Sequence, residues 1–151
     1  MKTATLLLFV AGICSSASAQ FVATMEIKEP IPGLCSDQVV YALIPGLKGQ
    51  VPAECALSKE QLNDKLNAEI QFLKDNPKYD DKGMIGLIIN CKGKLVQCKM
   101  DNKTKSPELD SQIERVFSSI ENWTPGKLNK KSVDTSRLFS FTIKNGVLKL
   151  N

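Results

Sequence analysis

The chain has 151 residues with ordinary hydrophobic (42%) and charged (24%) fractions, which suits one globular domain with a modest core. Its formal net charge of +4 is too small to indicate nucleic-acid binding. Because the chain has no histidine, Ser-His-Asp and Cys-His nucleophiles and most proton shuttles at neutral pH are excluded. We expect a protein without catalysis, small-molecule substrate or cofactor.

Residues 1–19 have the layout of a secretory signal peptide. An apolar run from 6 to 13 precedes the small residues Ala17-Ser18-Ala19, so we expect cleavage before Gln20 and a protein that is exported, periplasmic or secreted. Membrane anchoring is the alternative, but a spanning helix needs about 20 apolar residues and this run is shorter. A lipid-modified Cys14 is a third interpretation, which the bulky Ile13 before it disfavours.

Residues 20–57 are expected to form an irregular arm, since prolines and glycines interrupt them throughout. The apolar residues 39–44 fit either a short strand or an apolar segment lying on the domain. The pattern does not decide between the two.

Residues 59–75 are predicted to form a helix. Ser58 and Gln61 have the spacing of a capping box, in which the hydroxyl accepts the N3 amide and the Gln side chain returns to the cap. One helix face then carries apolar residues at i, i+4, i+8 and i+11, namely Leu62, Leu66, Ile70 and Leu73. Asn76-Pro77 ends the element.

Residues 84–90 and 94–100 are predicted to form a β-hairpin about Lys92-Gly93. If Cys91 pairs with Lys94, then Ile89 faces Val96 and Leu87 faces Cys98. In this register one face of the hairpin is apolar and would form the floor beneath the helices, with Ile85, Leu87, Ile89, Val96, Cys98 and Met100.

Four cysteines follow the expected cleavage site: Cys35, Cys55, Cys91 and Cys98. An even number in an exported domain indicates two disulfides. In the hairpin register Cys91 and Cys98 lie about 13 Å apart, whereas bonded Cα atoms lie within about 7 Å. We therefore expect each of them to pair with Cys35 or Cys55 and to tie the arm to the sheet. The absence of histidine and of a C-x-x-C pair argues against a metal site.

A second helix, a turn and a strand pair follow in residues 106–150. Apolar residues at helical spacing predict the helix: Leu109, Ile113, Val116, Phe117 and Ile120. It ends before Trp123, which we expect to fill the junction of helix and sheet, while Pro125 fixes φ and Gly126 permits φ > 0. Residues 138–143 are predicted to form a strand, which Asn145-Gly146 turns into residues 147–150.

This C-terminal part resembles the C-terminal domain of the TonB family of energy-transducing proteins. The similarity lies in three runs: Leu109-Asp110, then Trp123-Thr124-Pro125-Gly126-Lys127-Leu128-Asn129-Lys130-Lys131-Ser132-Val133, then Phe139-Ser140-Phe141-Thr142-Ile143. With residues 83–101 it covers roughly half of the chain. Lys130 stands where the family usually has glycine, so this turn is expected to differ.

The elements and the resemblance together predict an α+β fold for residues 58–151, with two helices packed on one face of a three- to four-stranded, mainly antiparallel sheet. The resemblance implies an exported protein-binding module of a Gram-negative bacterium, linked to transmembrane transport. Its partner would be a segment of an outer-membrane receptor, added as a β-strand at or near a sheet edge. The strand residues concerned are Leu138, Phe139, Ser140, Phe141, Thr142 and Ile143.

Two other functions stay open beside this one. A membrane-anchored TonB-type energy transducer would need an uncleaved anchor and a long Pro-rich spacer, and the few prolines of the arm do not make one. A secreted enzyme inhibitor could reuse the same fold, because fold does not fix function.

Positive charge gathers in the C-terminal part, where Lys127, Lys130 and Lys131 lie close together in the sequence. They fit either a solvated strand edge that lysine protects against aggregation, or a docking surface for an acidic partner.

Overall fold

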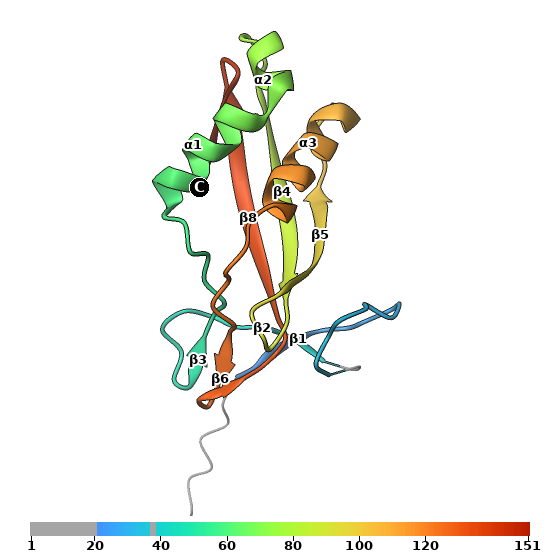
Figure 1. The fold of residues 1–151 in the computed structure, drawn as a ribbon, viewed down its shortest axis with the longest axis vertical. Helices are drawn as coiled ribbons and strands as arrows, with labels where there is room; N and C mark the ends of the chain where they lie inside the picture. Colours follow the sequence, from blue (N-terminus) through green and yellow to red (C-terminus); the bar gives the residue numbers. More distant parts are fainter. Residues whose placement is uncertain (1–20, 37–38) are drawn as a thin grey trace, which may run out of the picture.

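The computed structural model describes residues 21–36 and 39–151, so the predicted signal peptide lies outside the described residues. The fold is α+β, as predicted. The helices α1 (Lys59–Glu69), α2 (Gln71–Asp75) and α3 (Pro107–Ser118) pack on a long sheet. The short strands β3 (Gln50–Val51) and β6 (Lys127–Leu128) lie at the end of the molecule opposite α2 (Figure 1).

The main sheet is mixed and has six strands in the order β1-β2-β8-β4-β5, with β9 also paired with β8. It contains β1 (Ala23–Met25), β2 (Val40–Ala42), β4 (Asp81–Ile89), β5 (Leu95–Asn102), β8 (Thr135–Lys144) and β9 (Val147–Leu150). The predicted three to four strands were too few, because the arm adds β1 and β2. Of these, β2 pairs in parallel with β8. The arm is therefore not irregular throughout.

A second, three-stranded sheet joins the arm to the C-terminal part. β3 (Gln50–Val51) pairs with β6 (Lys127–Leu128), which pairs in turn with β7 (Lys131–Ser132). The turn between β6 and β7 has Asn129 and Lys130 in the left-handed region, at φ 50° and 70°. This is the geometry that suits a two-residue hairpin.

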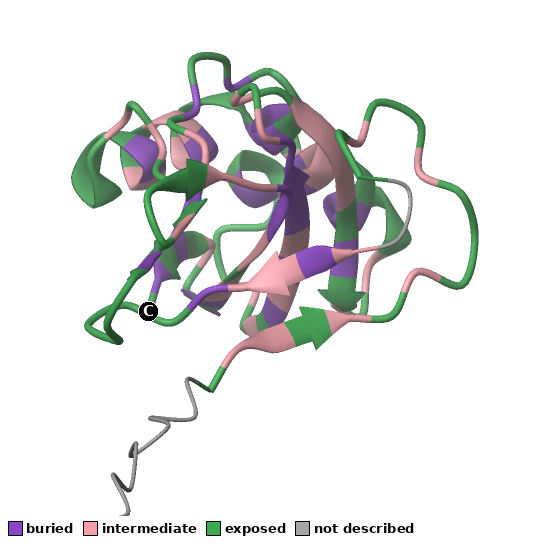
Figure 2. Ribbon diagram, turned by 90° about the horizontal axis from the view of Figure 1, so that it is seen from below, coloured by how far each residue is buried: buried purple, intermediate pink, exposed green. Residues whose placement is uncertain are grey.

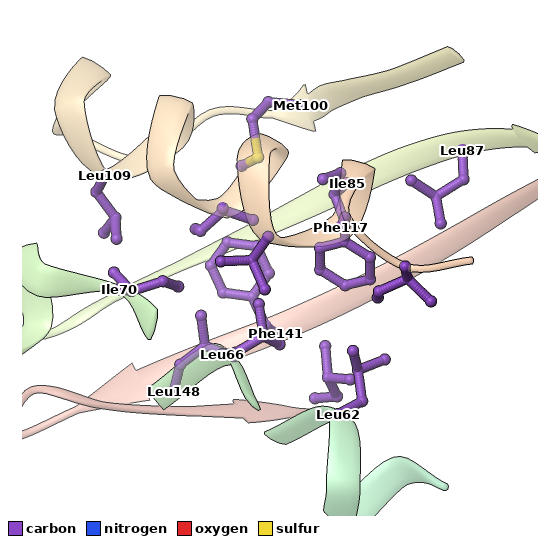
Figure 3. Packing of buried hydrophobic residues seen from close by; sticks show 14 of the residues in the cluster. Leu62, Leu66, Ile70, Ile85, Leu87, Met100, Leu109, Phe117, Phe141 and Leu148 are labelled. Carbon is purple, nitrogen blue, oxygen red and sulfur yellow. The ribbon is translucent and has the colours of Figure 1, made fainter. Parts of the chain in front are cut away.

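The core lies between the helices and one face of the main sheet. Phe117 of α3 and Phe141 of β8 are almost fully buried, as are Leu62 and Leu66 of α1 and Ile85 of β4 (Figure 3). Seen from the β3 and β6 end, buried residues lie within the layers and the loops around them are mostly exposed (Figure 2). The helices therefore cover one face of the sheet, as the apolar spacing predicts.

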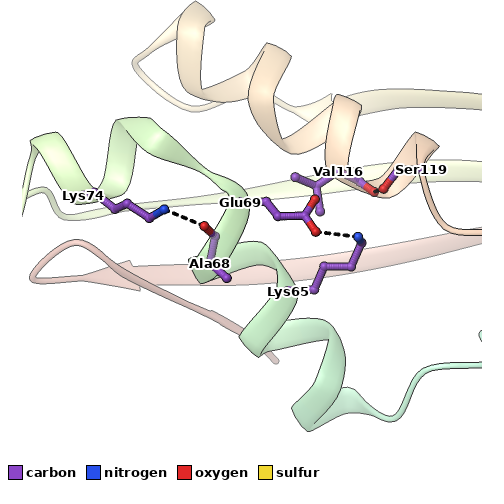
Figure 4. A network of polar contacts seen from close by, with 6 residues as sticks. All are labelled: Lys65, Ala68, Glu69, Lys74, Val116 and Ser119. Atoms are coloured by element: carbon purple, nitrogen blue, oxygen red, sulfur yellow. Dashed lines mark hydrogen bonds and ion pairs between the residues drawn. The ribbon is translucent and has the colours of Figure 1, made fainter.

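The predicted helix 59–75 is broken at Ile70, which has an extended backbone (φ −83°, ψ 103°) between α1 and α2. The predicted capping box of Ser58 and Gln61 is present. Two contacts hold the break: the Gln112 side chain of α3 accepts the Phe72 N–H (3.0 Å), and Lys74 donates to the Ala68 carbonyl (2.6 Å). Figure 4 shows the second contact beside the exposed Lys65–Glu69 ion pair.

The β4–β5 hairpin has the predicted register at Leu87 and Cys98 but not near its turn. A bulge after Ile88 makes Ile89 face Leu95 rather than Val96. The predicted position of Val96 on the core face is therefore wrong, and Leu95 packs against the core instead. The Asn90 side chain accepts the N–H groups of Lys92 and Lys94 (3.0 Å each), which favours this tighter turn.

The turn after α3 lies where it was predicted, but Gly126 is needed there for a different reason than the predicted positive φ. Trp123 is buried, and its indole N–H donates to the Ile120 carbonyl (3.1 Å). Gly126 does not have a positive φ. A Cβ at Gly126 would instead collide with the Thr135 side chain, so close approach to β8 requires glycine here.

One disulfide, Cys35–Cys91, ties the arm to the β4–β5 hairpin. It is one of the pairings that the sequence allows. Cys55 and Cys98 are free thiols, so the second expected disulfide is not formed. Beside the bridge, the buried Asp134 carboxylate accepts the backbone N–H groups of Cys35, Ser36 and Cys91 at 2.7–2.9 Å. These contacts together form a staple between the arm and the sheet.

Candidate functional site

Strand β8 is fully paired on one side only. Towards β4 its register runs without a break from Thr135 to Ile143. Towards the other side it pairs with β2 at Thr135 and with β9 from Phe141 to Lys144. Residues 136–139 thus have no strand partner on this side in the part of the chain that the structure describes. We call this stretch the strand gap.

Residues 138–143 form a strand, as predicted, and lie within β8 (Thr135–Lys144). The resemblance implied a place at or near a sheet edge, and β8 does not lie at the edge itself. β8 is an interior strand, because β2 and β9 add on its far side. The edge survives only as the strand gap between these two strands. Contacts made by residues distant in sequence decide this, so the local pattern could not show it.

One hydrogen bond shows which backbone N–H and C=O groups of β8 face the strand gap. The Asn151 N–H donates to the Ser140 carbonyl (2.9 Å), so Ser140 faces β9. Because backbone groups alternate along a strand, the N–H and C=O of Leu138 point the same way, where no strand pairs with them. The backbone groups of Phe139 point to β4 instead.

A cleft of about 420 Å³ opens on the helix side of the strand gap. Its walls come from β8, from the end of β9, from the first turns of α1 and from the connection that leads to α1. They include Cys55, Leu57, Leu62 and Phe139, together with the charged Glu54, Lys59 and Arg137. The cleft is thus mixed in character, with an apolar base and charges around it.

A groove of about 350 Å³ lies by the strand gap on the opposite face of the sheet. Met25, Ala42, Ile88 and Leu138 give it a mostly apolar lining. Gly86 also lines the groove, and a Cβ there would lie in ordinary van der Waals contact (3.5 Å) with a methyl group of Leu138. The Leu138 side chain is 59% exposed, which is unusual for a leucine in an interior strand.

Arg137 and Phe139 join the cleft to the core. The Arg137 guanidinium lies 5.5 Å from the centroid of the Phe139 ring, which packs against Phe117 and Trp123. The Arg137 Nε is buried and has no hydrogen-bond partner among the described residues. A buried donor without a partner is costly, so a carbonyl or carboxylate entering the cleft would gain from it.

The structure brings together only some of the residues singled out from the sequence. Leu138, Phe139 and Ser140 lie at the strand gap, whereas Phe141 and Ile143 are buried in the core and Thr142 pairs with β9. Lys127 and Lys131 lie in the second sheet instead, and Lys130 lies in the turn that joins its strands β6 and β7. The sequence marked Cys55 only as a disulfide candidate and gave no sign that Glu54 and Cys55 lie beside β8, because only the tertiary fold brings them there.

The cysteines differ in their surroundings. Cys55 lines the cleft. Burial raises the pKa of the Cys98 thiol to about 11, with the Glu114 charge adding to it, and Cys98 donates to the Glu114 carbonyl (3.5 Å). The grouping of Cys35, Cys91 and Asp134 is a structural one, since both sulfurs form the disulfide and the carboxylate accepts backbone N–H groups.

Comparisons with protein-family models, with curated proteins and with solved structures each gave no match to this chain. The TonB resemblance therefore stays a prediction from motifs. Among the helices of residues 21–36 and 39–151, none is long and apolar enough to cross a membrane.

Proposed function

We propose that the protein is a protein-binding module that takes up a short extended segment of its partner by β-strand addition at the strand gap. One observation carries the proposal: β8 has unpaired backbone groups between β2 and β9, with a cleft on one face and a groove on the other. Main-chain hydrogen bonds supply affinity in this binding mode, and pockets for alternate side chains supply specificity.

The two cavities define the segment that would fit. Successive side chains of a strand point to opposite faces, so alternate residues of the segment would enter the groove and the cleft. The lining of the groove by Met25 and Leu138 favours an apolar side chain. The cleft, with Arg137 and Lys59 beside Phe139, favours a side chain with an apolar stem and an acceptor at its tip. The gap is short, about 13 Å for four residues, so the segment would be short as well.

The sequence resemblance suggests where in the cell this binding takes place and which kind of partner is bound. It supports an exported module of a Gram-negative envelope, whose partner is an extended segment of an outer-membrane receptor. This part of the proposal depends on the motifs around Trp123 and Phe139 and not on the strand gap.

The experiment is binding of a library of short extended peptides, measured by fluorescence anisotropy, with the variant Leu138→Pro. Proline removes the N–H that faces the strand gap and leaves the bonds to β4 in place, so binding should fall at least about tenfold while the fold is kept. Leu138→Ala should weaken binding less, because it removes only the side chain in the groove.

Val147→Ala is the matched control, since Val147 is similarly exposed (48%) but lies in β9 away from the strand gap. It should leave peptide binding unchanged. Equal peptide affinities for the wild type and for a folded Leu138→Pro variant would exclude strand addition here.

A further inference from the structure

Four of the six exposed large hydrophobic side chains in the described residues gather away from the strand gap. They are Phe21 (67% exposed), Ile44 (39%), Leu47 (40%) and Val51 (49%). Val51 belongs to β3, at the end of the molecule opposite α2 (Figure 1). We call these four residues the apolar tip.

The apolar tip is held together by one buried side chain. The Gln50 side chain accepts the Ile44 N–H (3.0 Å) and donates to the Phe21 carbonyl (2.6 Å). The Gln50 N–H donates to the Leu47 carbonyl (3.0 Å), which closes the loop between Ile44 and Gln50. These hydrogen bonds fix exposed apolar residues in place, whereas folding alone would favour burying them.

The loop projects from the molecule. Gly46 and Gly49 have positive φ, and a Cβ at Gly46 would meet no atom within 4 Å. The apolar residues thus lie on a convex turn and not in a groove that another side chain could fill.

The hairpin beside the apolar tip carries lysines. Lys127 is the cross-strand neighbour of Val51, and Lys130 and Lys131 follow in the same hairpin. The Asn129 N–H donates to the Gly49 carbonyl (2.7 Å), which holds this hairpin against the loop. Residues 44–53 and 122–133 contain no Asp or Glu.

We propose that the apolar tip and its lysines dock on the surface of an anionic lipid bilayer. The apolar side chains would enter the headgroup region, and Lys127, Lys130 and Lys131 would contact the lipid phosphates. The charge is complementary to anionic lipid, and a convex apolar turn matches a soft interface better than the surface of a folded protein. The proposal is independent of the strand gap, whose residues lie in β8.

The test is co-sedimentation of the protein with two kinds of vesicle, one of phosphatidylcholine alone and one of phosphatidylcholine with about 30% phosphatidylglycerol. The protein is purified in the form in which the cell accumulates it, and a measurement of its intact mass establishes where its N-terminus lies. Binding is expected only to the anionic vesicles, and it should weaken with added salt because exposed charges are screened.

The variants separate the two parts of the surface. Leu47→Asn should weaken vesicle binding about tenfold, and Lys127→Ala or Lys131→Ala about fivefold each. Val147→Asn, a similar change on β9, should bind as the wild type does, and circular dichroism should show that each variant is folded. These four results together would support the proposal.

Two results would overturn it. One is no binding of the wild type to anionic vesicles at low salt. The other is equal vesicle binding of the wild type and Leu47→Asn, since this would mean that the lysines act alone and fit any polyanion, including an acidic protein.

Discussion

Lys130 has a backbone conformation that residues with a side chain rarely adopt, at φ 70° in the turn between β6 and β7. The motif that this part of the chain resembles has glycine at this position, and glycine is the residue that adopts a positive φ without steric cost. The turn needs two left-handed residues, and an L-residue pays about 1 kcal/mol there.

Lys130→Gly should therefore raise the free energy of unfolding by about 0.5–1 kcal/mol, after the greater freedom of glycine in the unfolded chain is counted. Asn129→Gly is the matched control and should give a smaller gain, because asparagine tolerates this conformation better. Urea unfolding of both variants measures the difference. If Lys130→Gly is less stable than the wild type, contacts of the lysine side chain must stabilise the fold by more than the left-handed backbone conformation destabilises it.

Asp81 is a second residue whose contacts predict a measurable effect. Burial on its own raises the pKa of the Asp81 carboxyl, but N–H donors of Lys105 and Lys82 and the Tyr79 hydroxyl (2.7 Å) outweigh it, so the pKa is lowered. In turn, burial and the bond to Asp81 raise the pKa of Tyr79 to about 12.

A carboxyl whose pKa is lower in the folded state contributes stability above its unfolded pKa, and this is lost as the pH falls. Asp81→Asn should accordingly cost about 0.5–1 kcal/mol at pH 7, because the donors lose a charged acceptor whose interactions solvent partly screens. The cost should shrink as the pH falls below about 4, where the unfolded carboxyl is protonated. Denaturant unfolding at several pH values measures this. A cost that does not change with pH would contradict the assignment.

At the scale of elements, local patterns predict where helices and strands occur but not how they end. The apolar spacing of α3 and the capping box of α1 are confirmed. The break at Ile70 depends on Gln112, 42 positions away, and the bulge near Ile89 on the side chain of Asn90. Neither contact leaves a periodic signal in the sequence.

We expect removal of the Cys35–Cys91 disulfide, which is part of the staple between the arm and the sheet, to lower the free energy of unfolding strongly. Cys35 and Cys91 are 56 positions apart, and closing a loop of that length stabilises a fold by about 4 kcal/mol. The double variant Cys35→Ser with Cys91→Ser should lose about this much unfolding free energy. A reducing agent should destabilise the wild type similarly and leave the double variant unchanged. If the reductant affected both proteins equally, another disulfide would have to form.

At the scale of the whole molecule, the sequence predicts the α+β class and the face that the helices cover, but not the position of β8 within the sheet. That position depends on β2, which comes from the arm about 95 residues upstream in the chain, and on the place where β9 stops. The candidate site was therefore predicted in part: its strand was identified, while its boundaries and both cavities come from long-range packing.

The most direct test of the strand gap is backbone hydrogen exchange of neighbouring β8 residues in the unliganded protein, followed by NMR. The Leu138 N–H faces the gap and the Phe139 N–H faces β4, so we expect Leu138 to exchange about 100-fold faster or more. Addition of a bound peptide should slow Leu138 and leave Phe139 unchanged. Equal protection of the two N–H groups in the free protein would contradict the account, because β8 would then have a partner on both sides.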